Sequence, residues 1–241
     1  MFGFIGFGFD WQHLLWVALP MMGLAMIAQL WLKSTLTKFS EIPNQQGISG
    51  AEAAQIILRK AGITDVSVEQ AEGFLSDHYS PHEKIVRLSP DIYHGKSIAS
   101  VGVAAHEVGH AIQHNRHYAP LAIRSLAVPL ASIGSMFGYI TIVIGMFMGH
   151  GQVNAISLIG LGLIGCVALF QLINLPVEFD ASNRAVALLP EIGILSPEEN
   201  VGARKVLAAA AFTYVAATIA AVWELLFWAM RLGLLGGNRR D

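Results

Sequence analysis

The segment His106-Glu107-Val108-Gly109-His110 places two imidazoles and a carboxylate at a spacing suited to metal chemistry. If the segment is helical, His106 and His110 lie one turn apart on the same face, roughly 6 Å from each other. Such a pair can supply two ligands to one tetrahedral Zn²⁺. Glu107 is rotated by about 100° around the helix axis, which lets its carboxylate reach an attacking water from the side as a general base. The pattern therefore predicts zinc-dependent hydrolysis, against the alternative of two histidines on a solvated helix surface.

A catalytic zinc usually has three protein ligands and one open position, so a third ligand is needed. His114 would lie about 12 Å beyond His106 along the helix axis, and it cannot reach the same metal unless the helix breaks. Position 116, where a metzincin would have its third histidine, is occupied by Arg116, which excludes that class. The third ligand therefore has to come from a more distant segment.

Glu178 is the third ligand that the organisation of the chain favours. It follows a long apolar stretch, at the point where a membrane hairpin would return to the face that carries His106 and His110. A carboxylate there can meet the two histidines, although an acidic residue near a helix N-terminus is also stabilised by the helix dipole. Asp180 is the competing ligand, or it pairs with Arg184 one turn later.

Charge is scarce in this chain and is unevenly distributed. Only 13% of the 241 residues are Asp, Glu, Lys or Arg, while 54% are apolar. An average soluble domain has about 25% charged residues. These values exclude a disordered chain and a nucleic-acid binder driven by net charge. Cys166 is the only cysteine, which excludes an intramolecular disulfide framework and a multi-cysteine metal site.

Long apolar stretches predict four membrane-spanning helices, because a bilayer core requires about 20 helical residues per span. Leu14–Leu32 and Val206–Met230 each provide one span. The segment 125–177 contains no charged residue and provides two spans, separated by a turn at 149–152. The alternative is four buried helices of a soluble bundle, but so long a charge-free segment is hard to bury in a chain of this size.

With four spans, the polar segments 33–119 and 176–205 lie on the same side of the membrane. Lys and Arg are concentrated there, so the positive-inside rule places this side, with the zinc site, in the cytoplasm; the C-terminal arginines oppose the rule.

The expected organisation is an N-terminal region with the first span (1–32), a polar domain with the His-Glu-Val-Gly-His helix (33–119), a hairpin of two spans (120–177), a third-ligand helix and loop (178–205), and the last span with its tail (206–241).

The polar segment 33–119 shows the pattern of a small α+β unit. Ser49 and Glu52 form a capping-box pattern that begins a helix. Alternating residues predict strands at Thr64–Gln70 and Lys84–Leu88, a loop is expected at 73–81, and a helix rich in small residues is expected from Ser97 to about His114.

Three stretches of the chain resemble a known family of membrane enzymes. They are DHYSP at 77–81, KIVRLSPDIYHGKSIASVGVAAHEVGHAIQH at 84–114 and NLPVEFDAS at 174–182. These are similar to the YugP-like family of membrane zinc metallopeptidases, which are relatives of the HtpX-type gluzincins, and the likeness covers nearly the whole chain. In the HtpX-type group a Glu-x-x-Ala-Asp motif supplies the third ligand. Glu178 and Ala181 match this motif, whereas Ser182 replaces its final Asp.

The resemblance implies a mainly α fold, with about four multi-pass membrane helices and a small α+β zincin-like metallopeptidase unit. It implies a zinc peptidase site, with Zn²⁺ as the cofactor, but no known substrate; the expected substrate is a polypeptide that is itself a membrane or membrane-proximal protein. The expected location is a bacterial cell membrane, with the lipid bilayer as surroundings and no nucleic acid as partner. A homo-oligomer or a partner protein in the membrane is left open.

The resemblance also suggests roles around the metal. Ser182 and Asp180 are expected to support the ligands through hydrogen bonds. Lys84–Leu88 is expected to be the edge strand to which a substrate adds. An oxyanion needs a further donor, for which the candidates are His78, Tyr79, Tyr93 and His117.

Two other functions are compatible with parts of this sequence. A site-2-type intramembrane protease also has His-Glu-x-x-His, but within a membrane helix and with a distant aspartate ligand, which would be Asp180. A non-catalytic membrane scaffold with structural zinc is the other. Structural sites, however, usually have four protein ligands and no glutamate beside the first histidine.

Glu224 is the only charged residue in the last expected span. A carboxylate within a membrane helix is expensive and usually has a partner or a function. It can pair with Arg124, or it can line a water-filled cavity.

Overall fold

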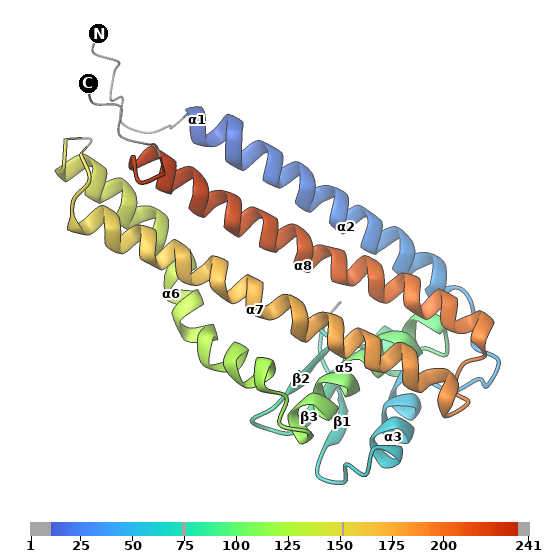
Figure 1. The fold of residues 1–241 in the computed structure, drawn as a ribbon. Coiled ribbons are helices and arrows are strands. Elements are labelled where there is room, and N and C mark those ends of the chain that lie inside the picture. The colour runs from blue at the N-terminus through green and yellow to red at the C-terminus, as the bar shows by residue number, and fades with distance from the viewer. Residues whose placement is uncertain (1–10, 74–75, 151, 236–241) are drawn as a thin grey trace. The chain divides into compact units, whose positions relative to one another are not determined.

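The computed structural model describes residues 11–73, 76–150 and 152–235, and most of these residues are helical (Figure 1). The elements, in chain order, are α1 (Trp11–His13), a π-helical stretch (Leu14–Ala18), α2 (Leu19–Ser40), α3 (Gly50–Lys60), β1 (Ser67–Gln70), β2 (His78–Ser80), β3 (Ile85–Leu88), α4 (Pro90–Tyr93), α5 (Ile98–Asn115), α6 (Ala119–Met148), α7 (Ala155–Glu191) and α8 (Pro197–Arg231). The predicted fold class, a mainly α chain with a small α+β unit, is confirmed.

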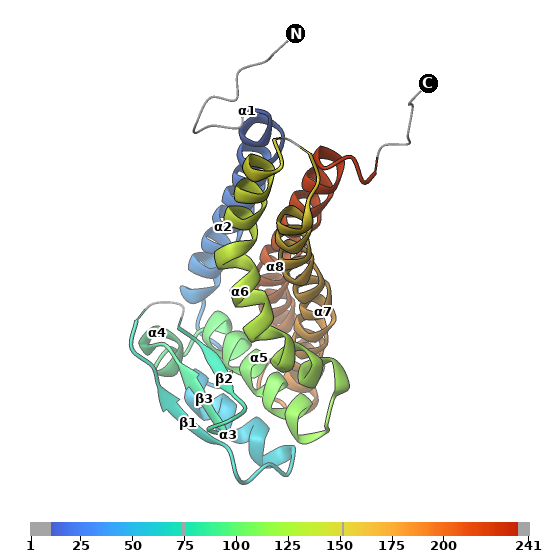
Figure 2. The same cartoon turned by 90° about the vertical axis from the view of Figure 1, so that its left-hand side faces the viewer.

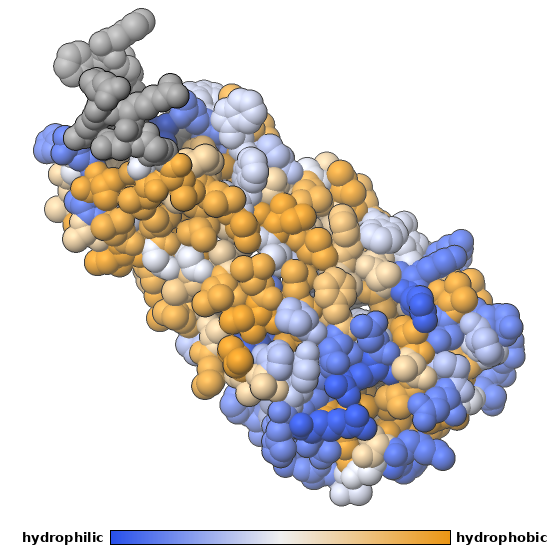
Figure 3. All heavy atoms as spheres, in the orientation of Figure 1, coloured by the Kyte–Doolittle hydropathy of each residue, from blue (hydrophilic) through white to orange (hydrophobic). Residues whose placement is uncertain are grey.

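Four helices among the described residues are long and apolar enough to cross a membrane, namely Trp11–Ser40, α6, α7 and α8. Each has 30 residues or more, whereas a bilayer core requires about 20. Many of their large apolar side chains are exposed, and Figure 3 shows apolar residues covering these helices over much of their length. Such surfaces are unfavourable in water but not in lipid. The four expected apolar helices are confirmed as candidate membrane spans, and each extends beyond the apolar stretch that predicted it.

The chain divides into two compact units, and the division falls within the long helices. Unit 1 comprises the described residues of Met1–Ile27, Ala127–Leu172 and Val215–Asp241. Unit 2 comprises those of Ala28–Leu126 and Ile173–Tyr214. All the residues expected to bind metal or take part in catalysis belong to unit 2.

In unit 1, α6 and α7 pack closely through glycines. Gly134 and Gly138 lie one turn apart on α6, and a Cβ added there would be 2.4 Å from Leu163 O and 2.9 Å from Ile164 Cγ1 of α7, respectively. Gly160 of α7 approaches the backbone of α6 equally closely. Small residues at this spacing let membrane helices pack without a hydrophobic driving force. This packing accounts for the hairpin of the two inner helices.

Glu224 of α8 pairs with His13, so the expected pairing with Arg124 is wrong. His13 Nε2 lies 2.9 Å from Glu224 Oε1, and Trp228 Nε1 donates a hydrogen bond to the same oxygen at 2.7 Å. The His13 ring also stacks on the Trp228 ring and lies beside Tyr139. Pairing with the imidazole and the indole offsets the cost of a carboxylate in an apolar helix.

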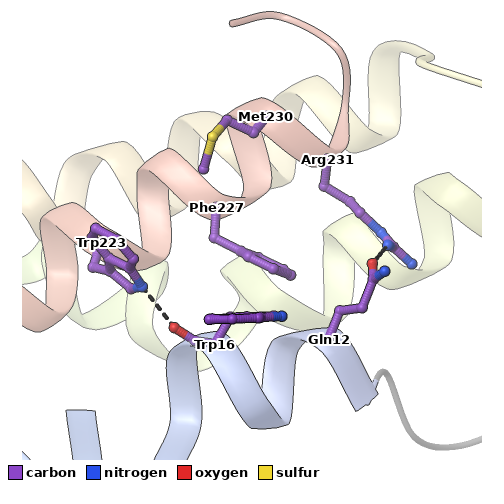
Figure 4. Close-up of a pocket in the computed structure, with 6 residues that line it drawn as sticks. All are labelled: Gln12, Trp16, Trp223, Phe227, Met230 and Arg231. Atoms are coloured by element: carbon purple, nitrogen blue, oxygen red, sulfur yellow. Dashed lines mark hydrogen bonds between the residues drawn. The ribbon is translucent and has the colours of Figure 1, made fainter. Parts of the chain in front are cut away.

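A hollow of about 400 Å³ lies in unit 1 where α1 begins and α8 ends. Trp223 donates a hydrogen bond to the Trp16 carbonyl at 2.8 Å, and Arg231 donates one to Gln12. Its lining contains no histidine, cysteine or carboxylate among the described residues, so it does not offer a metal site. The lining residues are Gln12, Trp16, Trp223, Phe227, Met230 and Arg231 (Figure 4).

In unit 2, α3 begins at the predicted capping box. Ser49 Oγ accepts a hydrogen bond from the Glu52 amide, and the Glu52 carboxylate accepts one from the Ser49 amide at 2.6 Å. This reciprocal pair satisfies two amide groups that the first turn leaves free. α3 packs against α5, and buried residues such as Ile57 and Val101 join them in one hydrophobic core.

The three strands of unit 2 form one mixed sheet in the order β1-β3-β2 (Figure 2). β1 is parallel to β3 and β2 is antiparallel to it, with Tyr79 opposite Val86. Two expectations were therefore wrong. His78–Ser80 is a strand and not part of a loop, and Ile85–Leu88 is the central strand and not an edge. Val86 and Leu88, which alternate along this central strand, are fully buried.

The second half of α7 belongs to unit 2 and packs directly on α5. α7 continues through Glu178, although Pro176 lies inside it, so no new helix begins at residue 178. A Cβ added to Gly109 of α5 would lie only 2.7 Å from the Ala181 carbonyl oxygen. Glycine at position 109 therefore permits a backbone approach between the two helices that no other residue allows.

We predict that Gly109→Ala destabilises unit 2. The added methyl group would press on the backbone of α7, and overpacking of this kind costs about 1–3 kcal/mol. Thermal unfolding in detergent, followed by circular dichroism, should give a lower midpoint than the wild type. Gly162→Ala on α7 is the matched control, because a Cβ there meets nothing within 4 Å. Equal midpoints for all three proteins would contradict this account of the packing.

Candidate metal site

α5 is the element that carries the two histidines, and its sequence explains its position. Ser97 is the N-cap, and its hydroxyl accepts a hydrogen bond from the Ser100 amide at 3.0 Å. Residues with small side chains then follow, and Ala104, Ala105 and Ala111 are almost fully buried. Small side chains on most faces allow neighbouring elements to approach the helix closely. The histidines are therefore presented from a rigid, buried helix.

His106, His110 and Glu178 form a compact cluster in unit 2. His106 Nε2 lies 3.4 Å and His110 Nε2 lies 3.6 Å from Glu178 Oε2. One ligand atom from each of the three residues lies within 4.8 Å of the others. The Glu178 side chain is only 2% exposed. The two helices thus bring two imidazoles and one carboxylate, from segments far apart in the chain, to one point.

Gln113 determines which nitrogen of His110 faces the cluster. The Gln113 amide group donates hydrogen bonds to the Val177 carbonyl and to Asp180 Oδ2, both at 2.8 Å. Its amide oxygen is therefore left to accept from His110 Nδ1 at 2.9 Å. With the proton on Nδ1, the Nε2 lone pair of His110 is directed at Glu178 and is free to bind a cation.

Ser182 and Asp180 occupy the surroundings of the cluster. Ser182 Oγ lies 3.1 Å from His106 Nδ1, so it can accept the proton of that nitrogen and leave Nε2 free. Asp180 pairs with Arg184 at 2.6 Å and also accepts the bond from Gln113. Asp180 is therefore engaged on the side of the ligands and is not part of the cluster of ligand atoms.

The cluster fits a zinc ion. One ligand atom each from His106, His110 and Glu178 faces the others, His110 and Glu178 are buried, and Glu178 Oε2 has no hydrogen-bond partner among the described residues. Facing acceptors are unfavourable unless a positive charge lies between them. Two imidazole nitrogens and one carboxylate oxygen form a ligand set typical of catalytic zinc. Mg²⁺ and Ca²⁺ prefer oxygen ligands, so this set selects against them.

Glu107 is buried beside the cluster. Burial raises the pKa of Glu107 to about 7, and the carboxylates of Glu178 and Asp77 act in the same direction. His106 and the backbone amide of Tyr79 oppose this rise. The carboxyl group therefore lies in surroundings that disfavour its charged form, next to the first histidine of the cluster.

Two residues near Glu178 were not expected from the sequence. Arg124 Nη1 of α6 lies 3.3 Å from Glu178 Oε1, on the side of the carboxylate away from the oxygen that faces the histidines. The Tyr214 hydroxyl of α8 interacts electrostatically with Glu178, Glu107 and Arg124. One feature of the sequence could have pointed to Arg124, because it is the only Asp, Glu, Lys or Arg in α6. No feature of the sequence pointed to Tyr214, because its position depends on how α8 packs.

The four candidate oxyanion donors lie outside the cluster of ligand atoms. None of their side chains forms a hydrogen bond, ion pair or ring contact with the cluster in the part of the chain that the structure describes. Burial raises the pKa of Tyr79 to about 12, and its hydroxyl bonds to His114 Nδ1 at 2.8 Å. His78 bonds to the Ser76 carbonyl, Tyr93 packs on the His94 ring, and His117 lies exposed in a turn after α5.

Comparisons with known proteins identify a family whose description includes zinc. Residues 14–233 match the model of a family described as "Putative neutral zinc metallopeptidase". A protein of Bacillus subtilis (strain 168) described as "Putative membrane protease YugP" is 41% identical over 218 residues, which are 90% of this chain and 95% of that protein. No solved structure matches the chain.

We predict that Gln113→Leu weakens zinc binding by about 10- to 100-fold, the usual effect of losing a hydrogen bond that orients a ligand histidine. Leucine would leave His110 Nδ1 without its acceptor and would release the amide bonds to α7. The dissociation constant can be measured by competition with a fluorescent zinc chelator. Gln55→Leu, at an exposed position of α3, should bind zinc as the wild type does. Unchanged affinity in Gln113→Leu would show that the amide does not orient the ligand.

Proposed function

Because the chain belongs to the zinc metallopeptidase family that its residues 14–233 match, we propose that it is a membrane-bound zinc endopeptidase with Glu107 as the general base. His106, His110 and Glu178 would hold the metal. The observation that carries the proposal is the convergence of His106 Nε2, His110 Nε2 and Glu178 Oε2 in a largely buried cluster, with the Glu107 carboxyl group beside it.

Zn²⁺ bound to this cluster would act as a Lewis acid, polarising the scissile carbonyl and lowering the pKa of the attacking water. Glu107 accepts the proton of that water and later delivers it to the amine nitrogen that leaves. The Nδ1 atoms of His106 and His110 keep their protons and donate them in hydrogen bonds to Ser182 and Gln113, respectively. Neither imidazole then competes for the proton of the water. The burial of Glu107 limits proton exchange with bulk solvent during this transfer.

The proposed substrate is a polypeptide in or near the membrane. Four helices long and apolar enough to cross a bilayer contribute residues to unit 2, and this supports a substrate close to the lipid. By sequence, the bounds of unit 1 contain three of the 15 Lys and Arg residues, namely the C-terminal Arg231, Arg239 and Arg240, and the other 12 belong to unit 2. By the positive-inside rule, the zinc site then faces the cytoplasm.

We predict that Glu107→Gln keeps its zinc and loses its peptidase activity. A positioned general base contributes about 10²- to 10⁴-fold to the rate, and an amide cannot accept the proton. Zinc content and the cleavage of fluorescein-labelled casein should be measured on the purified wild type and the variant. Glu198→Gln, an exposed residue in the first turn of α8, is the matched control and should resemble the wild type in both measurements.

The possible outcomes separate the rival functions. Cleavage at the wild-type rate by zinc-loaded Glu107→Gln would show that Glu107 is not the base. A wild type that binds zinc and cleaves no protein substrate would contradict the peptidase function and favour a zinc-containing scaffold.

A further inference from the structure

Arg124 is the only Asp, Glu, Lys or Arg in the 30 residues of α6. A single cation in such an apolar helix is costly and is usually compensated by a partner. Its guanidinium lies 3.3 Å from Oε1 of Glu178, and Glu178 is also the carboxylate of the metal cluster. The Arg124 side chain is 28% exposed, whereas that of Glu178 is 2% exposed. The cation therefore meets a buried anion that is proposed to bind the metal.

The two oxygens of Glu178 face different partners. Oε2 faces the Nε2 atoms of His106 and His110, at 3.4 Å and 3.6 Å. Oε1 faces Arg124. Both of these contacts lie within unit 2, and the carboxylate is held between them by the backbone of α7. Rotation of the carboxylate that turned Oε1 toward the histidines would separate it from the guanidinium.

This division bears on how many oxygens the carboxylate offers to a metal. A carboxylate can bind a cation through one oxygen or through two. Catalytic zinc keeps one position open for water, and a second carboxylate oxygen would compete for that position. We propose that Arg124 holds Oε1 of Glu178 and thereby keeps this carboxylate a one-oxygen ligand. This inference rests on the proposed zinc site and makes Arg124 a positioning residue, because it acts through Glu178.

A positioning role for Arg124 has different consequences from a purely structural role. A structural counter-ion would affect the stability of the protein and leave the bound carboxylate unchanged. A positioning residue changes the way in which the carboxylate binds, and lysine should replace it in part, because an ammonium group can also hold one oxygen. Arg124→Gln removes the positive charge and keeps a polar side chain that can still form hydrogen bonds.

The test compares zinc-loaded wild type, Arg124→Gln and Arg124→Lys in lipid nanodiscs. Arg204→Gln is the matched control, since Arg204 is an exposed arginine of unit 2 on α8. Infrared difference spectra, zinc-loaded minus zinc-free, are recorded on proteins labelled with ¹³C-glutamate. The antisymmetric and symmetric carboxylate stretches lie farther apart for one-oxygen binding than for two-oxygen binding. Zinc content, the unfolding midpoint and kcat with labelled casein are measured on the same samples.

We expect the wild type, Arg124→Lys and Arg204→Gln to show the wide separation and Arg124→Gln to show the narrow one, with zinc retained. kcat of Arg124→Gln should fall by about 10- to 100-fold, because a small misplacement at a reacting centre has an effect of this size. The same wide separation in Arg124→Gln would overturn the inference. Loss of zinc by Arg124→Gln would also overturn it, since the guanidinium would then be needed for metal binding itself.

Failure of the proposed function would look different. A wild type that binds no zinc removes the site and this inference together. A wild type that binds zinc but does not cleave casein contradicts the peptidase function only, and the infrared comparison still decides the role of Arg124.

Discussion

The close approach of α5 to α7 is the contact on which the candidate site depends. Gly109 leaves room for the Ala181 carbonyl, and three residues before Ala181 the carboxylate of Glu178 meets the two histidines of α5. A side chain at position 109 would move the helices apart and separate the ligands. The requirement for glycine therefore lies within the same five residues that supply His106 and His110. Packing and ligand geometry are consequently set by one short segment of α5.

Hydrogen bonds to the Nδ1 atoms of the two histidines orient their imidazoles toward Glu178. Gln113 links His110 to the α7 backbone and to Asp180, and Ser182 of α7 meets the other histidine. Each imidazole thus has its Nδ1 side occupied and its Nε2 side directed at Glu178. Arg124 faces the opposite oxygen of that carboxylate. Two of the helices that are long and apolar enough to cross a membrane, α6 and α7, therefore also carry residues at the candidate site.

Much of this arrangement could be predicted from the sequence, where the signal is local or follows from topology. The spacing of His106 and His110 predicts a metal pair, and Glu178 follows from the return of a membrane hairpin. The strand at His78–Ser80 was missed because its residues resemble a turn and its pairing with β3 is not encoded locally. One of the two alternatives for Glu224, pairing with Arg124, was wrong, because the packing of the helices decides which charges meet and no local sequence pattern gives that packing.

The most direct test of the account is the zinc affinity of Glu178→Gln compared with that of Asp180→Asn. Both substitutions replace a carboxylate with an amide on the same turn of α7, but only Glu178 contributes an atom to the cluster. The account predicts that the wild type binds about one Zn²⁺ per chain, that Glu178→Gln loses more than about 100-fold in affinity, and that Asp180→Asn loses much less. Retention of zinc by Glu178→Gln together with its loss from Asp180→Asn would contradict the proposed ligand set.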